Sequence, residues 1–229
     1  MDLRSPSRAG GREEAVRFSL TDPNSIFQSG WAVTYKREEK VGGIDFQGAG
    51  LIENSFLQPE KIWILHGRRV ANLACRIFLL AGGTPKDAWK LWLAAANHDC
   101  GKFGEVYNKR EKLTEKDWEI IRFHPLIGRL VFGLKWCDKL DKQDLIHIMS
   151  MISYHHERPD GKGYFHYKLT SVPVQAIIMA DILDAANSYR PYQNDRRPLL
   201  SIVMESLRHG FDADLVNSVI EVGNSYFGE

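Results

Sequence analysis

The chain has 229 residues, of which 44% are hydrophobic and 26% are charged, so it can bury the core of one domain that carries an extension. This composition excludes a chain that is disordered throughout. Thirty Lys and Arg residues against 29 Asp and Glu residues give a net charge of +1, so no overall field attracts polymeric nucleic acid or an anionic membrane, and any anion site has to be local.

The cysteines and the N-terminus bear on the cellular compartment. Cys75, Cys100 and Cys137 are scattered and form no CxxC pair, which suits a reducing compartment better than a disulfide framework. Residues 1–20 lack the apolar segment of a signal peptide, and no apolar run approaches the roughly 18 residues of a membrane-spanning helix. We therefore expect a cytoplasmic protein with no membrane partner.

The first part of the chain has no regular pattern. Residues 1–57 are expected to form a loop-rich N-terminal extension that is partly disordered, because the segment is rich in glycine and only Trp31 to Tyr35 alternates like a strand. Residues 58–229 are expected to form the functional domain.

From Pro59 onward the apolar residues recur with a helical period. Thr84 and Pro85 supply an N-cap and a first-turn proline, and Thr114 with Asp117 forms a capping box. Helices are expected over 59–80, from 84 towards 98, over 114–124, from 125, over about 141–156 and 172–189, and twice after 198, with loops at 100–113 and 157–171. The pattern predicts an all-α fold of about seven or eight helices.

Polar residues on the apolar faces of five predicted helices indicate the chemistry. His66 lies four residues after Ile62 and four before Val70, so an imidazole interrupts the core stripe of its helix. The same interruption recurs on the other helices. The polar residues expected to point inward are His66, His98, Asp99, His124, His155, His156 and Asp181.

A single histidine on an apolar face is most often a hydrogen-bonded core residue. Seven buried groups without partners would cost about 1–3 kcal/mol each, which is comparable with the ~5–15 kcal/mol by which a whole domain is stable. The seven groups must therefore satisfy one another or share a ligand. Neutral imidazoles mainly offer lone pairs and carboxylates add negative charge, so a pair of divalent cations satisfies them better than mutual hydrogen bonding.

The order of these residues is compatible with a dinuclear site. Adjacent residues on a helix point about 100° apart, so His98 and Asp99 at a helix end can face one metal together, with the carboxylate reaching a second. His155 and His156 can both reach the second ion only from a helix terminus. His124 precedes a proline, which biases its backbone away from helical geometry.

Four ordered motifs carry a family resemblance: HDCGK at 98–102, HP at 124–125, HHERPDGKGYF at 155–165 and DILDAANSYRPY at 181–192. A lone HD dipeptide would carry almost no information, but four motifs in order do. From about residue 58 to the C-terminus, the chain resembles an HD-GYP domain of the HD superfamily of metal-dependent phosphohydrolases. The resemblance implies an HD-domain helical bundle and a phosphodiesterase that hydrolyses a cyclic dinucleotide, most favourably cyclic di-GMP.

The resemblance also implies a ligand set for two divalent metal ions. The first metal would be held by His66, His98 and Asp181, the second by His124, His155 and His156, with Asp99 bridging them. Mixed imidazole and carboxylate ligands favour iron or manganese, while zinc, nickel or cobalt are also compatible. A hydroxide between the two ions would attack the phosphorus.

Beyond the metals, the resemblance implies catalytic and substrate-binding residues. Lys102 matches the lysine that meets the substrate phosphate, and Asp184 would position Lys102 or Arg190. With Asp99, Lys102 and Asp184 are the expected catalytic residues. The residues expected to contact substrate are Arg190, Lys102, Arg158, Lys162, Tyr164 and Tyr192, and further candidates are Arg196, Arg197, Phe165 and Tyr167.

The chain departs from the family pattern at three places. Phe165 replaces the proline of the GYP triad, which stiffens the loop on the substrate side. Ile62 stands where a three-metal subset of the family carries a glutamate, which favours two metals. The loop from Phe103 to Lys112 is shorter than usual and lacks its usual proline.

Three alternatives stay open. The chain could be a receptor that binds cyclic di-GMP without turnover and signals to a protein partner, which Phe165 favours and the intact ligand set disfavours. It could be an HD-fold phosphohydrolase for another nucleotide or phosphate ester, with which the altered substrate loop is compatible. It could also be a di-iron oxygenase of the same fold, although the HHE and RPY motifs favour hydrolysis.

Overall fold

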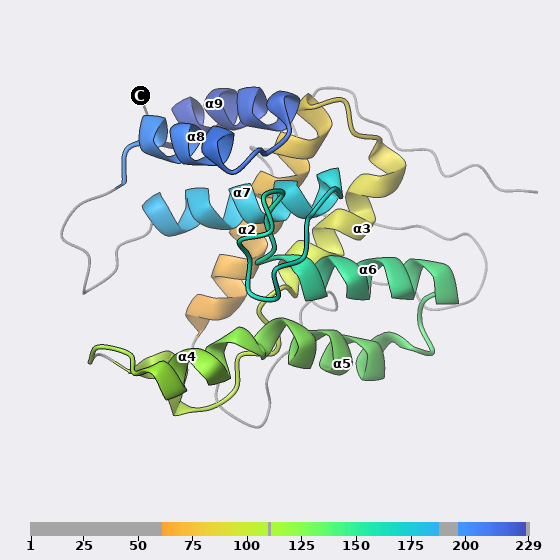
Figure 1. Cartoon of the computed structure of the whole chain (residues 1–229). Coiled ribbons are helices and arrows are strands. Elements are labelled where there is room, and N and C mark those ends of the chain that lie inside the picture. The colour runs from red at the N-terminus through yellow and green to blue at the C-terminus, as the bar shows by residue number, and fades with distance from the viewer. Residues whose placement is uncertain (1–60, 110, 188–196, 228–229) are drawn as a thin grey trace, which may run out of the picture. The chain divides into compact units, whose positions relative to one another are not determined.

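The computed structural model of the chain describes residues 61–109, 111–187 and 197–227. This part is helical and contains no strand (Figure 1). Its elements are α2 (Lys61–Leu80), α3 (Pro85–Ala96), the 3-10 helix η1 (Glu105–Asn108), α4 (Glu115–Arg122), α5 (His124–Trp136), α6 (Lys142–Tyr154), α7 (Val172–Asn187), α8 (Leu199–Arg208) and α9 (Ala213–Phe227). The all-α prediction is confirmed for these residues, and the expected extension at 1–57 lies outside them.

Local capping signals explain where several helices begin. The side chain of Thr84 accepts a hydrogen bond from the backbone N–H of Asp87 at the start of α3. Thr114 and Asp117 form the predicted capping box at the start of α4. Asp141 caps α6 by accepting from two backbone N–H groups of the first turn. These contacts satisfy N–H groups that have no partner within a helix.

The junction between α4 and α5 differs from the prediction. Helix α4 ends at Arg122, and His124 is already the first residue of α5, separated from α4 by Phe123 alone. The expectation of a non-helical backbone at His124 is therefore wrong. A proline is tolerated directly after the first helical residue, because the N–H that it lacks would have no helical partner there.

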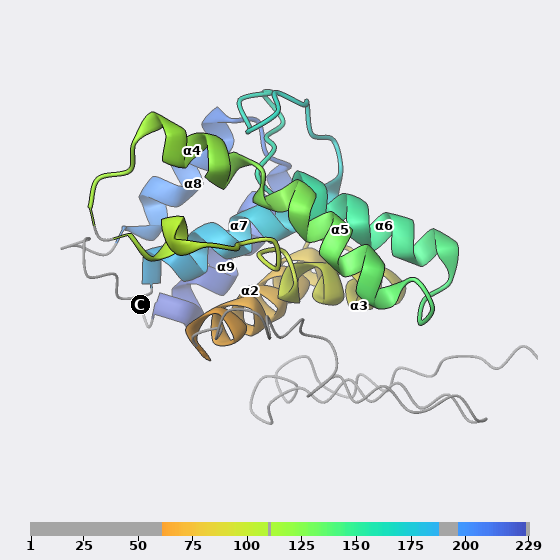
Figure 2. The same cartoon turned by 90° about the horizontal axis from the view of Figure 1, so that it is seen from below.

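The helices pack around one core. Helix α2 contacts α3, α7 and α9, while α3 contacts α6, and α6 lies beside α5 (Figure 2). Helices α8 and α9 lie side by side above α7 in Figure 1. Fully buried apolar residues such as Ile77, Leu91, Ile152 and Ile177 join α2, α3, α6 and α7 in this core. The core helices therefore fix the spacing of whatever side chains they carry at their meeting point.

The turn after α3 lies very close to the start of α5. A Cβ atom at Gly101 would overlap the carbonyl oxygen of His124 and the backbone nitrogen of Gly128. Only glycine permits this approach. The turn that contains His98 and Asp99 is thereby held against the helix that begins with His124.

Across the described residues, no helix combines the length and apolarity that crossing a membrane requires.

Candidate metal centre

The structure brings the seven expected ligands together in two adjacent groups. In each group, one ligand atom per residue lies within 4.8 Å of the others. The first group consists of His66, His98 and Asp181, and the second of Asp99, His124, His155 and His156. The side chains come from α2, the turn after α3, the start of α5, the end of α6 and the middle of α7.

Asp99 lies between the two groups. Its Oδ2 is 3.3 Å from Nε2 of His98 and 3.7 Å from Nε2 of His66. Its Oδ1 is 3.3 Å from Nε2 of His124 and 3.7 Å from Nε2 of His155. Each carboxylate oxygen thus faces one group, which is the arrangement that a bridging carboxylate needs.

Three of the imidazoles are oriented by the backbone just before them. In each, Nδ1 lies 2.7 Å from the carbonyl oxygen three residues earlier: His98 with Ala95, His124 with Ile121, and His155 with Ile152. These carbonyls belong to the last turns of α3, α4 and α6, where helical partners run out. A hydrogen on Nδ1 leaves the lone pair on Nε2, which faces the ligand groups.

Two buried atoms at the centre lack partners. Within the described part of the chain, His98 Nε2 and Asp99 Oδ1 are buried and have no hydrogen-bond partner of acceptable geometry. Leaving such atoms unsatisfied costs about 1–3 kcal/mol each. A cation beside both atoms removes that cost, and imidazole nitrogen with carboxylate oxygen is a donor set that suits divalent transition metals. The residues present therefore fit metal binding.

The pKa of His66 in the first group and the pKa values of His155 and His156 in the second group are shifted in opposite directions. Burial acts to lower the pKa of His66, but hydrogen bonds with Asp181 and Asp184 outweigh burial and raise that pKa to about 9. Burial lowers the pKa of His155 to about 4, and burial likewise holds the pKa of His156 well below its ordinary value. In the metal-free protein at neutral pH, His66 is therefore protonated, whereas His155 and His156 are neutral ligands.

The acids of the centre are held ionised. Burial alone would raise the pKa of Asp99, but electrostatic interactions with His98 and Lys102 hold that pKa well below its usual range. Burial is likewise overcome at Asp181 by its hydrogen bond with His66, which keeps the pKa of that carboxyl low. Both carboxylates can therefore offer negative charge to a cation.

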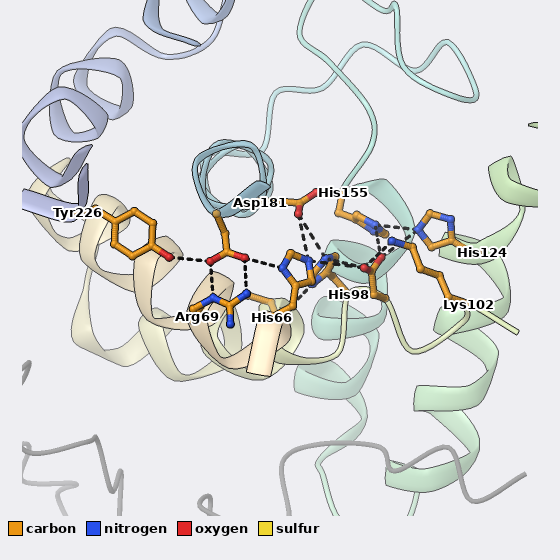
Figure 3. Close-up of polar contacts among 11 residues, drawn as sticks. His66, Arg69, His98, Lys102, His124, His155, Asp181 and Tyr226 are labelled. Carbon is orange, nitrogen blue, oxygen red and sulfur yellow. Dashed lines mark hydrogen bonds and ion pairs between the residues drawn. The ribbon is translucent and has the colours of Figure 1, made fainter. Parts of the chain in front are cut away.

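Asp184 is a buried carboxylate that lies behind His66. Its Oδ2 is 2.8 Å from Nδ1 of His66, and it accepts hydrogen bonds from Arg69 at 2.6 and 3.0 Å and from the hydroxyl of Tyr226 at 2.7 Å. Figure 3 shows Tyr226, Arg69 and His66 at one end of the site, with Lys102 and His124 at the other. The network joins α2, α7 and α9, and it orients the His66 ring with Nε2 towards the other members of the first group.

Asp184 was expected to position Lys102 or Arg190, and that role stays a prediction. Nζ of Lys102 lies 2.6 Å from Oδ2 of Asp99, and Arg190 is outside the described residues. Asp184 is one helical turn after Asp181 on α7, so its carboxylate is offset along the helix to where α2 and α9 pack. The structure makes Asp184 a hydrogen-bond partner of His66.

Two tyrosines border the second group. The Tyr164 ring stacks on His156 with the ring centroids 4.4 Å apart, and the Tyr107 ring lies edge-on to His124 at 6.2 Å. Burial, followed by the charge of Asp99, raises the pKa of each phenol to about 12. Both hydroxyls are therefore neutral at physiological pH and can donate hydrogen bonds.

The other expected substrate contacts have partners away from the two groups in the contacts given below, or lie outside the described residues. Nη1 of Arg158 is 2.9 Å from Nε2 of His209. The Lys162 side chain is largely exposed, with Nζ 3.7 Å from Oδ2 of Asp160. Arg197 pairs with Glu205 on α8. The rings of Tyr154 and Tyr167 stack with centroids 5.1 Å apart, and Phe165 is exposed. Arg190, Tyr192 and Arg196 fall in the undescribed range 188–196.

Sequence reasoning missed four residues of this neighbourhood: Arg69, Tyr107, Glu157 and Tyr226. Arg69 follows His66 by three residues, a spacing that places both on one helix face, so it could have been found. Glu157 stands in the HHE motif but was given no role there. Tyr107 and Tyr226 carry no signal of their own, because their roles depend on partners brought close by the fold.

Comparison with known proteins gives consistent matches. A protein-family model described as HD domain matches residues 63–187. A cyclic di-GMP phosphodiesterase of Thermotoga maritima is 31% identical over 138 residues, covering 57% of this chain and 36% of that protein. A cyclic di-GMP phosphodiesterase of Vibrio cholerae is 29% identical over 154 residues, covering 62% of this chain and 31% of that protein. The 3'3'-cGAMP-specific phosphodiesterase 3 of Vibrio cholerae is 31% identical over 140 residues, covering 56% and 28%. The chain thus spans about a third of the length of these relatives.

Proposed function

Since the chain belongs to the HD domain family, we propose that it is a metal-dependent phosphodiesterase that hydrolyses a cyclic dinucleotide, with cyclic di-GMP as the preferred substrate. One observation carries the proposal: seven side chains that can bind metal form two adjacent groups, and each group includes a buried atom without a hydrogen-bond partner among the described residues. These atoms are His98 Nε2 and Asp99 Oδ1. The substrate class is supported by the matched relatives, which are named for cyclic di-GMP and for cGAMP.

The proposal includes two metal ions, one for each ligand group, with iron or manganese favoured by the mixed donors. His66, His98 and Asp181 would hold the first ion, and His124, His155 and His156 the second, while Asp99 offers one oxygen to each group. When bound, such ions lower the pKa of water and polarise a phosphoryl oxygen.

Lys102 supplies positive charge at the edge of the centre. Its ammonium group lies 2.6 Å from Oδ2 of Asp99, and its side chain keeps 22% of its exposure. Lys102 can therefore reach a phosphate oxygen that enters beside Asp99. There it would neutralise the charge that develops on the phosphate, or donate a proton to the leaving ribose oxygen.

Tyr107 and Tyr164 would form the substrate-facing wall of the second group. Both rings border His124, with centroid distances of 6.2 and 6.3 Å. Their neutral hydroxyls can donate to phosphate oxygens, and their faces can meet a base. Arg158 and Lys162, from the same loop as Tyr164, would add positive charge near that wall. Arg190 and Tyr192 stay expected substrate contacts that lie outside the described residues.

The test begins with full-length protein purified without oxygen, in which bound metals are counted by mass spectrometry. The protein is then incubated with cyclic di-GMP, 3'3'-cGAMP, cyclic di-AMP and bis(p-nitrophenyl) phosphate. We expect two metals per chain and a linear dinucleotide as the product, formed fastest from cyclic di-GMP.

Other outcomes would replace the proposal. Saturable binding of cyclic di-GMP without product in any metal form would identify a receptor. Hydrolysis of only the simple diester would identify another phosphohydrolase. Consumption of oxygen with an organic substrate would identify an oxygenase.

A further inference from the structure

Glu157 is a buried acid that belongs to neither ligand group. It follows His155 and His156 directly and is 0% exposed. Its Oε1 accepts a hydrogen bond of 2.9 Å from the backbone N–H of Phe165, and its Oε2 accepts one of 2.7 Å from that of Tyr167. A buried carboxylate needs such donors, and two backbone N–H groups directed at one carboxylate make a strong attachment.

The backbone of residues 163–167, here called the cap loop, is shaped around this carboxylate. His166, between the two donors, has a φ of 59°, the only positive φ outside glycine in the described chain. Left-handed residues of this kind direct neighbouring N–H groups towards a single anion. At the other end of the loop, a Cβ atom at Gly163 would lie 2.5 Å from Cα of Glu157 and 2.6 Å from the carbonyl oxygen of His156. The cap loop is therefore pressed against the segment that carries the ligands.

Tyr164 stands between these two attachment points. Gly163 before it is in close contact with Glu157, and Phe165 after it donates to the same residue. The Tyr164 ring stacks on the ligand His156 with an interplanar angle of 27°. Glu157 is thus connected to Tyr164 through the backbone on both sides of that residue.

The donor at position 165 depends on this chain's departure from the GYP triad. A proline has no backbone N–H, so it could not make the bond from position 165 to Oε1 of Glu157. With Phe165 the chain gives up the fixed φ of a proline and gains this hydrogen bond. One restraint on the loop has been exchanged for another.

We propose that Glu157 is a positioning residue, whose two hydrogen bonds to the cap loop hold Tyr164 against His156, and that the N–H of Phe165 supplies the restraint that a proline supplies in the GYP triad. The consequence for substrate binding rests on the proposed function, because Tyr164 is a substrate contact in that proposal. The attachment of the cap loop to Glu157 does not depend on the proposed function.

The first variant is Glu157→Gln, which keeps the shape but replaces one acceptor oxygen with an NH2 donor. The cap loop presents two donors, so one of them now faces another donor. We expect backbone amide exchange in the 163–167 segment of the full-length protein, followed by mass spectrometry, to be about tenfold faster or more. Glu221→Gln, at an exposed glutamate of α9, is the matched control and should leave this exchange unchanged.

The second variant adds Phe165→Pro to Glu157→Gln. The proline removes the donor that opposes the new NH2 group and stiffens the loop, while the remaining amide oxygen can accept from Tyr167. We expect the double variant to recover slow exchange at Tyr167. Recovery to the wild-type rate marks the two restraints as interchangeable, and a double variant that exchanges as fast as Glu157→Gln overturns that claim.

Activity and metal content separate positioning from other effects. In Glu157→Gln we expect an unchanged metal count, a KM for cyclic di-GMP raised about fivefold, and a kcat for bis(p-nitrophenyl) phosphate within about twofold of the wild-type value.

Unchanged amide exchange in the cap loop contradicts the two hydrogen bonds, and loss of metal contradicts a role confined to the cap loop. Faster exchange with an unchanged KM contradicts the role in substrate binding. If the wild type hydrolyses no cyclic dinucleotide, the proposed function fails, but the exchange rates still decide the attachment.

Discussion

The candidate metal centre orients His66 by different means from His124 and His155 on its other side. The ring of His66 is held by the side chain of Asp184, which in turn depends on Arg69 and Tyr226. The rings of His124 and His155 are held by backbone carbonyls only three residues earlier. A single substitution can therefore release the His66 ring, whereas no side-chain substitution removes the carbonyl partners of the other side.

The same contrast exists in charge. Hydrogen bonds with acids overcome the effect of burial and raise the pKa of His66 to about 9, while burial lowers the pKa of His155 to about 4. His66 is part of an ion-pair network, whereas His155 is a neutral ring whose Nε2 lone pair already points inward. Substitutions should therefore separate the two sides by their effects on metal binding.

The largest effect is expected where the two sides meet. Asp99→Ala removes the carboxylate that faces both groups, so we expect both metals to be lost and phosphodiesterase activity to fall by about a thousandfold or more. Metal counting and product formation measure this. Asp138→Ala, at an exposed residue, is the control. Normal turnover by Asp99→Ala would disprove the proposed mechanism.

Lys102→Ala should separate rate from metal content. The lysine contacts Asp99 but is not a ligand, so we expect both metals to stay bound while kcat falls about a hundredfold. Steady-state kinetics beside metal counting test this, with Lys142→Ala at an exposed position as the control. A variant that loses metal and rate together would make Lys102 part of the binding site.

Asp184→Asn tests the comparison directly. The amide removes the charge that orients His66, so we expect the metal of the first group to bind about 10- to 100-fold more weakly while the second group is unaffected. Metal titration that resolves two binding steps measures this, and Asp138→Asn is the control. Equal weakening of both steps would mean that the two sides are not independent.

Tyr226→Phe should have the smallest effect. It deletes one of the hydrogen bonds to Asp184 and keeps the ring, so we expect the free energy of unfolding to fall by about 1 kcal/mol. Urea denaturation of the metal-free protein measures this. Tyr154→Phe is the matched control, because the contact of Tyr154 with Tyr167 is made by its ring. A destabilisation equal to that of the control would remove Tyr226 from the network.

Features that depend on neighbours in the sequence were predicted well. Thr84 and Thr114 act within one helical turn, and both caps are confirmed. The clustering of the histidines was expected because each interrupts an apolar face, which is visible without knowing the fold. At His124 a local rule failed, because the preference of a residue before proline gave way to the start of α5.

Features that depend on distant partners could not be predicted. Arg69 and Asp184 are 115 residues apart, and Asp184 and Tyr226 are 42 apart, so only the packing of α2, α7 and α9 reveals their contact. Glu157 stands in a charged run of the sequence, which is typical of a solvated loop, yet its carboxylate is fully buried. Its burial follows from the return of the chain at 163–167, which no short pattern encodes.

The close approach of Gly101 to the start of α5 gives the centre a mechanical property. Because His98, His124 and His155 are each locked to preceding backbone, the rings move as rigid extensions of it. A slide of α3 relative to α5 by a few tenths of an ångström would alter several ligand distances at once. The spacing of α3 and α5 therefore sets how far apart the ring nitrogens of His98 and His124 lie.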